Sequence, residues 1–193
     1  MGDTSGDAAK PMRADARRNR EQVLDVARDV LAADGSSASF DEIARRAGVG
    51  VGTVYRHFPT RNALFKAVIA DRVEKLARRA RMLSADGTAP HQAFHGYFAE
   101  VVREVALNQA LCEALDNDAA AAIVMPGLLR DDFVRSFETL LSAAKKAGAV
   151  RAEVGIHDVL DLVVGAAAAE RRARARGVQN QLTAIVLDGL RAR

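Results

Sequence analysis

Apolar residues recur every three or four positions along most of the 193-residue chain, which is the spacing of one face of an α-helix. No segment alternates apolar and polar residues in the manner of a β-strand. The pattern therefore predicts an all-α protein. Glycine, proline and asparagine residues divide the pattern, and the predicted helices cover residues 17–34, 40–47, 53–58, 61–83, 90–107, 109–121, 127–147, 156–172 and 178–191.

The segment SFDEIARRAGVGVGTVYRHF, residues 39–58, predicts two short helices joined by a glycine-containing turn. Ser39 and Glu42 have the spacing of a capping box, in which Ser39 accepts from the Glu42 amide and the Glu42 carboxylate reaches back to the Ser39 amide. Gly48 ends this helix, because glycine takes the left-handed conformation without steric cost. Val54 and Phe58 lie four residues apart and anchor the second helix, which ends at the following proline.

The second helix of this pair leaves polar and basic side chains on its outer surface, namely Thr53, Tyr55, Arg56 and His57. Hydroxyl groups suit phosphate oxygens, and arginine suits phosphates or guanine edges. Residues 48–70 contain no aspartate or glutamate. Two helices joined by a tight turn, with a polar second helix, form a helix-turn-helix, whose second helix enters the major groove of DNA. The pattern therefore predicts a protein that binds double-stranded DNA.

The stretch AGVGVGTVYRHFPTRNALFKAV resembles the DNA-binding segment of the TetR family of bacterial transcriptional regulators, whose members carry G-V-S-x-G-T-x-Y-x-[YH]-F-x-[ST]-K-x-x-L there. The resemblance extends over residues 17–83 and is architectural beyond them. It implies an all-helical homodimer that represses transcription from a palindromic operator and is released by a small, apolar effector. A regulator without a small-molecule ligand is the alternative.

The same resemblance implies DNA contacts for seven side chains. Two positions depart from the family pattern: Gly50 replaces the usual serine, and Val51 stands where a polar or basic residue is frequent. Val51 is suited to the methyl group of thymine instead. The implied DNA-binding residues are Ser39, Thr53, Tyr55, Arg56, His57, Arg61 and Lys66.

Three parts of the chain are expected: a disordered tail (1–15), a helix-turn-helix domain (16–62) and a helical effector-binding and dimerisation domain (63–193). The charge distribution agrees, since residues 1–81 hold 16 basic and 11 acidic side chains, whereas residues 82–193 hold 12 and 14. Cys112 is the single cysteine, so no disulfide framework exists, and no leader or membrane segment is evident. A cytoplasmic protein is expected.

Two arginine-rich segments allow a further nucleic-acid contact. Arg13, Arg17, Arg18 and Arg20 are suited to an arm in the minor groove, and the alternative is a solvated helix start. The run ERRARAR, residues 170–176, lies near a predicted helix C-terminus, where the helix dipole favours cations, so a second nucleic-acid site is the less favoured interpretation there.

The middle helices concentrate aromatic and flexible side chains that would suit an apolar ligand. The same spacing is typical of an ordinary helical core, which is the favoured interpretation for each single residue. Polar contacts to a ligand are available from Tyr97, Asn108 and Gln109. The candidate ligand-binding residues are Phe94, Tyr97, Phe98, Cys112, Leu115, Met125, Phe133 and Phe137.

The last two predicted helices carry more apolar surface than one side of a helix can bury, and a run of small residues follows Gly165. Such helices pack on two faces, so we predict a four-helix bundle with the same helices of a second copy, against the alternative of a monomer's interior. The candidate interface residues are Leu160, Val163, Val164, Ala167, Leu182, Ile185, Val186 and Leu190.

A helical metal-binding or catalytic protein is the remaining alternative. His91 and His95 lie four apart on one helical face, and Cys112, Asp116 or His157 would complete a metal site. The sequence lacks the fingerprints of zinc proteases, nucleotide-binding loops and nucleophile elbows. We therefore predict no enzymatic activity, no metal and no cofactor.

Overall fold

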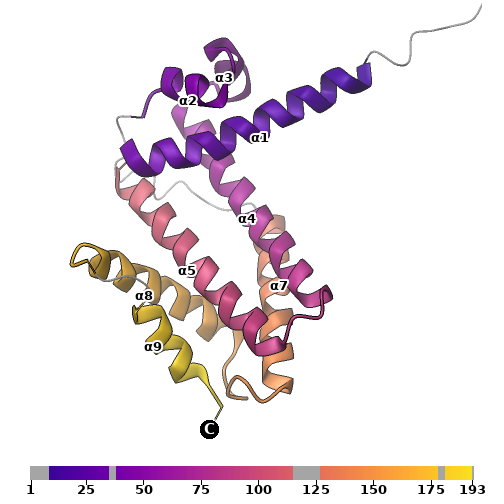
Figure 1. Cartoon of the computed structure of the whole chain (residues 1–193), viewed down its shortest axis with the longest axis vertical. Coiled ribbons are helices and arrows are strands. Elements are labelled where there is room, and N and C mark those ends of the chain that lie inside the picture. Colours follow the sequence, from indigo (N-terminus) through magenta and orange to yellow (C-terminus); the bar gives the residue numbers. More distant parts are fainter. Residues whose placement is uncertain (1–8, 35–37, 115–126, 178–180, 193) are drawn as a thin grey trace, which may run out of the picture. The chain divides into compact units, whose positions relative to one another are not determined.

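The computed structural model describes residues 9–34, 38–114, 127–177 and 181–192. The regular structure of these residues is helical, with one isolated antiparallel bridge between Val150 and Arg191 (Figure 1). The predicted all-α class is confirmed. The helices are α1 (Ala9–Asp34), α2 (Phe40–Ala47), α3 (Val51–His57), α4 (Arg61–Ala85), α5 (Pro90–Ala114), α7 (Gly127–Lys146), α8 (Ile156–Arg174) and α9 (Gln181–Leu190).

The described chain divides into two compact units, and the division falls within α4, between Asp71 and Arg72. The first unit contains α1, α2, α3 and the beginning of α4. The second unit contains the rest of α4, most of α5, and α7, α8 and α9. The helix-turn-helix segment therefore lies wholly in the first unit.

The first unit is built on the apolar stripe of α1, where Val23, Leu24, Ala27, Val30 and Leu31 are at most 1 % exposed. Helix α2 packs against α1, and α3 packs against α2 (Figure 1). Burying a large aliphatic side chain contributes about 1.5–3 kcal/mol, so this stripe accounts for most of the force that holds the short helices. The short helices contribute Ile43, Ala44, Ala47, Val54 and Phe58 to the same core.

The core of the second unit contains an aromatic cluster between α5 and α7. The Tyr97 and Phe137 rings meet edge to face with centroids 4.8 Å apart, and Phe94 and Phe133 each lie 6.0 Å from Phe137. The Tyr97 hydroxyl donates a hydrogen bond of 3.0 Å to the carbonyl of Leu76 on α4. Because this bond satisfies the one polar atom of the Tyr97 side chain, the cluster joins three helices as a dry core.

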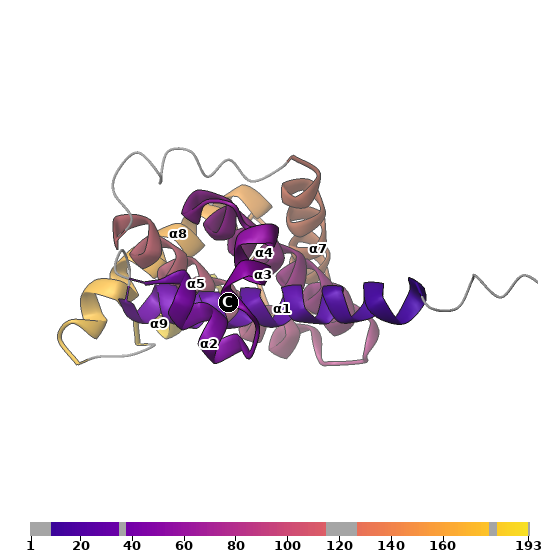
Figure 2. The same cartoon turned by 90° about the horizontal axis from the view of Figure 1, so that it is seen from above.

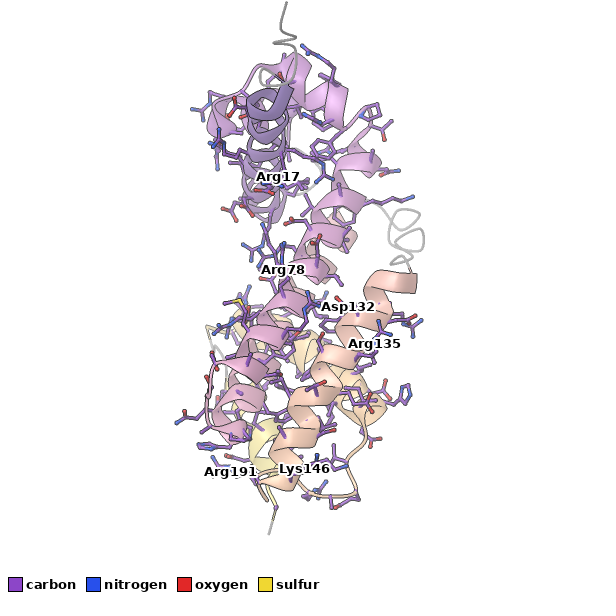
Figure 3. All side chains as sticks on the ribbon, turned by 90° about the vertical axis from the view of Figure 1, so that its right-hand side faces the viewer. Arg17, Arg78, Asp132, Arg135, Lys146 and Arg191 are labelled. Atoms are coloured by element: carbon purple, nitrogen blue, oxygen red, sulfur yellow. The ribbon has the colours of Figure 1, made fainter. Side chains whose placement is uncertain are left out.

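Ion pairs also connect α4 to its neighbours within the second unit. Arg72 meets the buried Glu104 of α5 at 2.6 Å, and Arg81 meets Asp132 of α7 at 2.6 Å. Figure 3 shows Asp132 on α7, the helix that also carries Arg135 and Lys146. Arg72 is therefore part of the packing between helices.

Helices α8 and α9 lie side by side in both Figure 1 and Figure 2. Glu170 of α8 is buried and accepts hydrogen bonds from both the amide and the hydroxyl of Thr183 on α9, each 2.8 Å long. A buried carboxylate with two such donors fixes the register of the two helices.

The boundaries of α5 and α1 differ from the predicted ones. Helix α5 runs unbroken to Ala114, so the predicted break at Asn108 is wrong. Asparagine disfavours a helix by less than about 1 kcal/mol, and the leucines and alanines around it favour the helix. Helix α1 begins at Ala9 and takes in part of the predicted disordered tail, with Pro11 in its first turn, where proline is tolerated. Within the described ranges, no helix is both long and apolar enough to cross a membrane.

Candidate nucleic-acid interface

Helix α2 begins and ends as its sequence predicts. The Ser39 hydroxyl accepts a hydrogen bond of 3.1 Å from the Glu42 amide, and Gly48 has a left-handed conformation with φ 65°. The second half of the predicted capping box is replaced, because the Glu42 carboxylate accepts from Arg45 and Arg46. Hydrogen bonds from Arg45, and then from Arg46, lower the pKa of Glu42 from 4.5 to about 2.

Helix α3 begins at Val51, two residues before the predicted start at Thr53. The carbonyl of Gly50 accepts from the Thr53 amide at 2.8 Å and from the Val54 amide at 3.4 Å, so Gly50 is the N-cap residue. The turn between the helices is correspondingly short, from Gly48 to Gly50. This shift makes Val51 the first residue of the candidate reading helix.

The inner side of α3 is anchored as predicted, since Val54 is fully buried and Phe58 is 2 % exposed. The guanidinium of Arg20 on α1 lies 5.6 Å from the Phe58 ring centroid, a cation–π contact that adds a further tie. On the outer side, Tyr55, Arg56 and His57 are exposed and Thr53 is half-buried. The predicted polar surface of α3 therefore exists.

Tyr55 is held in place by an aromatic neighbour, because its ring lies 4.8 Å from that of Phe40 on α2. The pair borders a hollow of about 310 Å³ where the beginnings of α2 and α4 meet the end of α3. Hydroxyl groups of Ser39 and Thr60, the N-cap residues of α2 and α4, lie at this hollow. Its lining residues are Ala38, Ser39, Phe40, Asp41, Tyr55, Pro59, Thr60 and Arg61.

The two basic residues assigned to α4 occupy different environments. Arg61 is half-buried, and its Nη2 donates a hydrogen bond of 2.6 Å to the carbonyl of Ala38, which precedes α2. Lys66 is exposed. The sequence pattern suggested a phosphate contact for both residues, but the structure gives Arg61 a structural role that only the fold reveals.

The N-terminal arginines are exposed on α1 but already paired. Arg17 lies 3.9 Å from Glu21, and Arg18 pairs with Asp15, each about one helical turn apart. The side chain of Arg13 lies outside the described residues. Local ion pairs such as these agree with a solvated helix start, while contact with the minor groove stays a prediction.

Five of the candidate ligand-binding residues lie in the aromatic cluster. Phe94, Tyr97, Phe98 and Phe137 are completely buried, and Phe133 is 8 % exposed. Their rings contact one another, so in this structure the five side chains pack as part of the core. The Cys112 side chain, Leu115 and Met125 lie outside the described residues.

The candidate interface residues fall into two groups. Val163, Ala167 and Leu190 are at most 3 % exposed within the single chain, so they belong to its own core and the surface assignment is wrong for them. Helical spacing shows which positions are apolar but not whether another element of the same chain covers them. Val164 is 52 % exposed, Ile185 is 59 % exposed, and Leu160, Leu182 and Val186 are half-buried.

The histidines do not form a cluster of metal ligands among the residues that the structure describes, where no group of three or more His, Cys, Asp or Glu side chains is able to hold an ion. His91 and His157 are exposed, and His95 is half-buried. Burial lowers the pKa of His95, with a further contribution from the positive charges of Arg191 and His91.

Comparison with known proteins relates both units to regulators. Residues 23–68 match the family described as bacterial regulatory proteins, tetR family, and residues 89–192 match the C-terminal domain of SbtR-like transcriptional regulators. A TetR transcription regulatory protein from Mycobacterium vanbaalenii is 38 % identical, with a TM-score of 0.72, and the match covers 94 % of this chain and 100 % of that one. A TetR transcriptional regulator from Streptomyces coelicolor is 30 % identical, with a TM-score of 0.76 and coverage of 90 % and 98 %.

The matches to curated relatives are shorter. The HTH-type transcriptional regulator SrpR of Pseudomonas putida is 41 % identical over 69 residues, which are 35 % of this chain and 32 % of the relative. The uncharacterized HTH-type regulator TtgW of the same species is 39 % identical over 69 residues, which are 52 % of its length. Among such relatives, the share of the relative's own length that the match covers ranges from 32 % to 58 %.

Proposed function

The chain belongs to the TetR family of bacterial transcriptional regulators, which bind DNA and are not enzymes, and we propose that it is a cytoplasmic repressor that binds a palindromic operator as a homodimer. The observation that carries the proposal is the outer surface of α3. Tyr55, Arg56 and His57 are exposed there, while Val54 and Phe58 fix the helix from below. A short helix held in this way presents its polar side to the major groove.

Each proposed DNA contact has a chemical reason. The hydroxyls of Tyr55 and Thr53, with the exposed ammonium of Lys66, suit phosphate oxygens. Arg56 and His57 are suited to base edges or phosphates, and the hollow beside Tyr55 offers the Ser39 hydroxyl to a phosphate. Arg61 supports this surface through its bond to Ala38.

The test is binding of the chain to duplex DNA from the region upstream of its gene, followed by fluorescence anisotropy across a salt series. We expect a discrete complex whose affinity falls steeply with salt, because lysine and arginine displace counterions from phosphates. Tyr55→Ala and Arg56→Ala should each weaken the complex at least about fivefold, whereas Glu138→Ala, an exposed position of α7, should leave it unchanged. A complex insensitive to salt and to both substitutions would refute the proposal.

Homodimerisation is supported by the exposed apolar residues of α8 and α9. Val164 and Ile185 are more than half exposed, although each is a large aliphatic side chain. Association of these helices with their copies would remove both from water, and it would present two reading helices to two half-sites. We expect a dimer by sedimentation, and a monomer that binds a single half-site weakly for the double variant Val164→Asp and Ile185→Asp.

We further propose that a small apolar effector releases the DNA by entering the aromatic cluster of α5 and α7. Phe133 is the most exposed ring of the cluster and marks the side from which entry requires the least displacement. A ligand that prefers the folded protein raises its thermal midpoint, so a thermal-shift screen with apolar compounds tests this step. If no compound raises the midpoint or releases DNA, the regulator without a small-molecule ligand becomes the better description.

A further inference from the structure

Val51, the first residue of α3, is an apolar side chain on a surface that is otherwise polar and basic. It is 37 % exposed, and its neighbours Gly50 and Gly52 have no side chains that would cover it. Exposure of an isolated valine is unremarkable on most surfaces. At the start of a reading helix, however, an apolar group has one base-specific partner in the major groove, the C5 methyl group of thymine.

Arg56 extends toward the same end of α3. A methyl group at position 52 would lie 3.9 Å from Nη2 of Arg56, so the guanidinium lies over Gly52, one helical turn before its own backbone. Helical side chains tilt toward the N-terminus, which explains this direction. The Arg56 guanidinium therefore reaches back to the first turn of α3, the turn that begins with Val51.

Because positions 50 and 52 are glycine, neither residue adds a side chain to the start of α3 beside Val51 and the Arg56 guanidinium. A methyl group at position 52 would be in van der Waals contact with that guanidinium. Base pairs are about 3.4 Å apart, and helix residues about 1.5 Å apart along the axis. Two groups at the same end of the helix consequently meet base pairs that are adjacent or one step apart.

We propose that Val51 and Arg56 together determine the base preference of this regulator: Val51 contacts a thymine methyl group, and Arg56 donates to N7 and O6 of a guanine within two base pairs of that thymine. This inference rests on the proposed function, because it concerns the half-site that α3 reads. The base preference would then depend on one apolar and one cationic side chain. The serine that is usual at position 50 in the family pattern would have added a polar contact.

The experiment begins with selection of tight-binding duplexes from a random pool by the full chain. Each thymine of the selected half-site is then replaced in turn by deoxyuridine, which lacks only the C5 methyl, and each guanine by 7-deazaguanine, which lacks N7. We expect one thymine at which deoxyuridine weakens binding about fourfold, the effect of one buried methyl group. We expect one guanine within two base pairs at which the loss is about 5- to 150-fold.

The variants Val51→Ala and Arg56→Ala assign these effects to side chains. Val51→Ala should bind the thymine and deoxyuridine duplexes equally, while it keeps its sensitivity to 7-deazaguanine. Arg56→Ala should lose the guanine preference and keep salt-dependent binding to unselected DNA. Thermal midpoints equal to that of the parent chain confirm that both variants fold, and deoxyuridine outside the half-sites is the control for altered duplex stability.

The outcomes separate this inference from the proposed function. If the parent chain forms no discrete complex with any duplex, the proposed function fails. If it binds a selected half-site but no methyl group matters, or if Val51→Ala keeps the same sensitivity to deoxyuridine, the assignment of Val51 is overturned while DNA binding stands.

Discussion

Glu170 and Thr183 connect α8 to α9 by two hydrogen bonds to one carboxylate oxygen, at 2.8 Å each. Both residues are buried, and the helices that they join carry the exposed Val164 and Ile185. Which side of each helix is exposed therefore depends on the register that this contact fixes.

Replacement of Glu170 by alanine should lower the free energy of unfolding by about 1.5–3 kcal/mol, since a buried amide and a hydroxyl lose a charged acceptor. The same variant should dimerise more weakly in sedimentation experiments. Glu170→Gln keeps an oxygen at the same place and is the matched control, with a smaller loss of stability. Equal stability of Glu170→Ala and the parent chain in urea unfolding would show that the contact is dispensable.

Arg61→Ala tests the structural role assigned to this arginine. Removal of a charged donor from the Ala38 carbonyl should lower the free energy of unfolding by about 1–2 kcal/mol. The slope of affinity against salt should stay unchanged. Lys66→Ala supplies the contrast, because loss of an exposed phosphate contact should reduce that slope by about one without a change in stability. If Arg61→Ala instead reduced the salt slope and left the stability unchanged, Arg61 would be a phosphate contact.

The pKa of Glu42 predicts an acid-dependent contribution to stability. Because this pKa is about 2 in the folded chain and 4.5 ordinarily, the folded state binds fewer protons between these values. The stabilisation is therefore complete above pH 4.5 and is lost as the pH falls toward 2. Carboxyl chemical shifts of Glu42, measured by NMR from pH 7 to pH 2, should show no titration near 4.5. Replacement of both Arg45 and Arg46 by glutamine should bring the transition back to that region.

His95 predicts a second pH dependence in a milder range. Its Nε2 is buried without a hydrogen-bond partner within the described structure, and burial lowers its pKa from 6.5. The unfolded chain takes up a proton more readily than the folded chain as the pH falls below 6.5, so His95 reduces stability there. His95→Leu should flatten the decline between pH 7.5 and pH 5.5 in urea unfolding. His157→Leu, at an exposed position, should leave the decline as it is.

The sequence predicted those features that local chemistry controls. The caps at Ser39 and Gly48, the anchors Val54 and Phe58 and the all-α class each depend on a few neighbouring residues, and each is confirmed. Features that depend on tertiary contacts were missed, because spacing along one helix does not reveal which neighbour a side chain meets.

Arg61 illustrates what the sequence could not show. Its phosphate assignment followed from charge and family pattern and stays a prediction, while its hydrogen bond to a carbonyl 23 residues earlier in the chain could not be read from the sequence. Helix α3 begins two residues before its predicted start for a related reason. Its N-cap residue, Gly50, acts through a backbone carbonyl, which no side chain in the sequence reveals. Val163, Ala167 and Leu190 were assigned to a surface because helical periodicity gives the apolar side but not the element that covers it.

The rings of Phe40 on α2 and Tyr55 on α3 contact each other within the first unit. A phenol already held by its neighbour gives up little rotational freedom when it meets a phosphate. Mutations at position 40 should therefore weaken the proposed binding to DNA, although the Phe40 side chain has no hydrogen-bonding group to offer a phosphate.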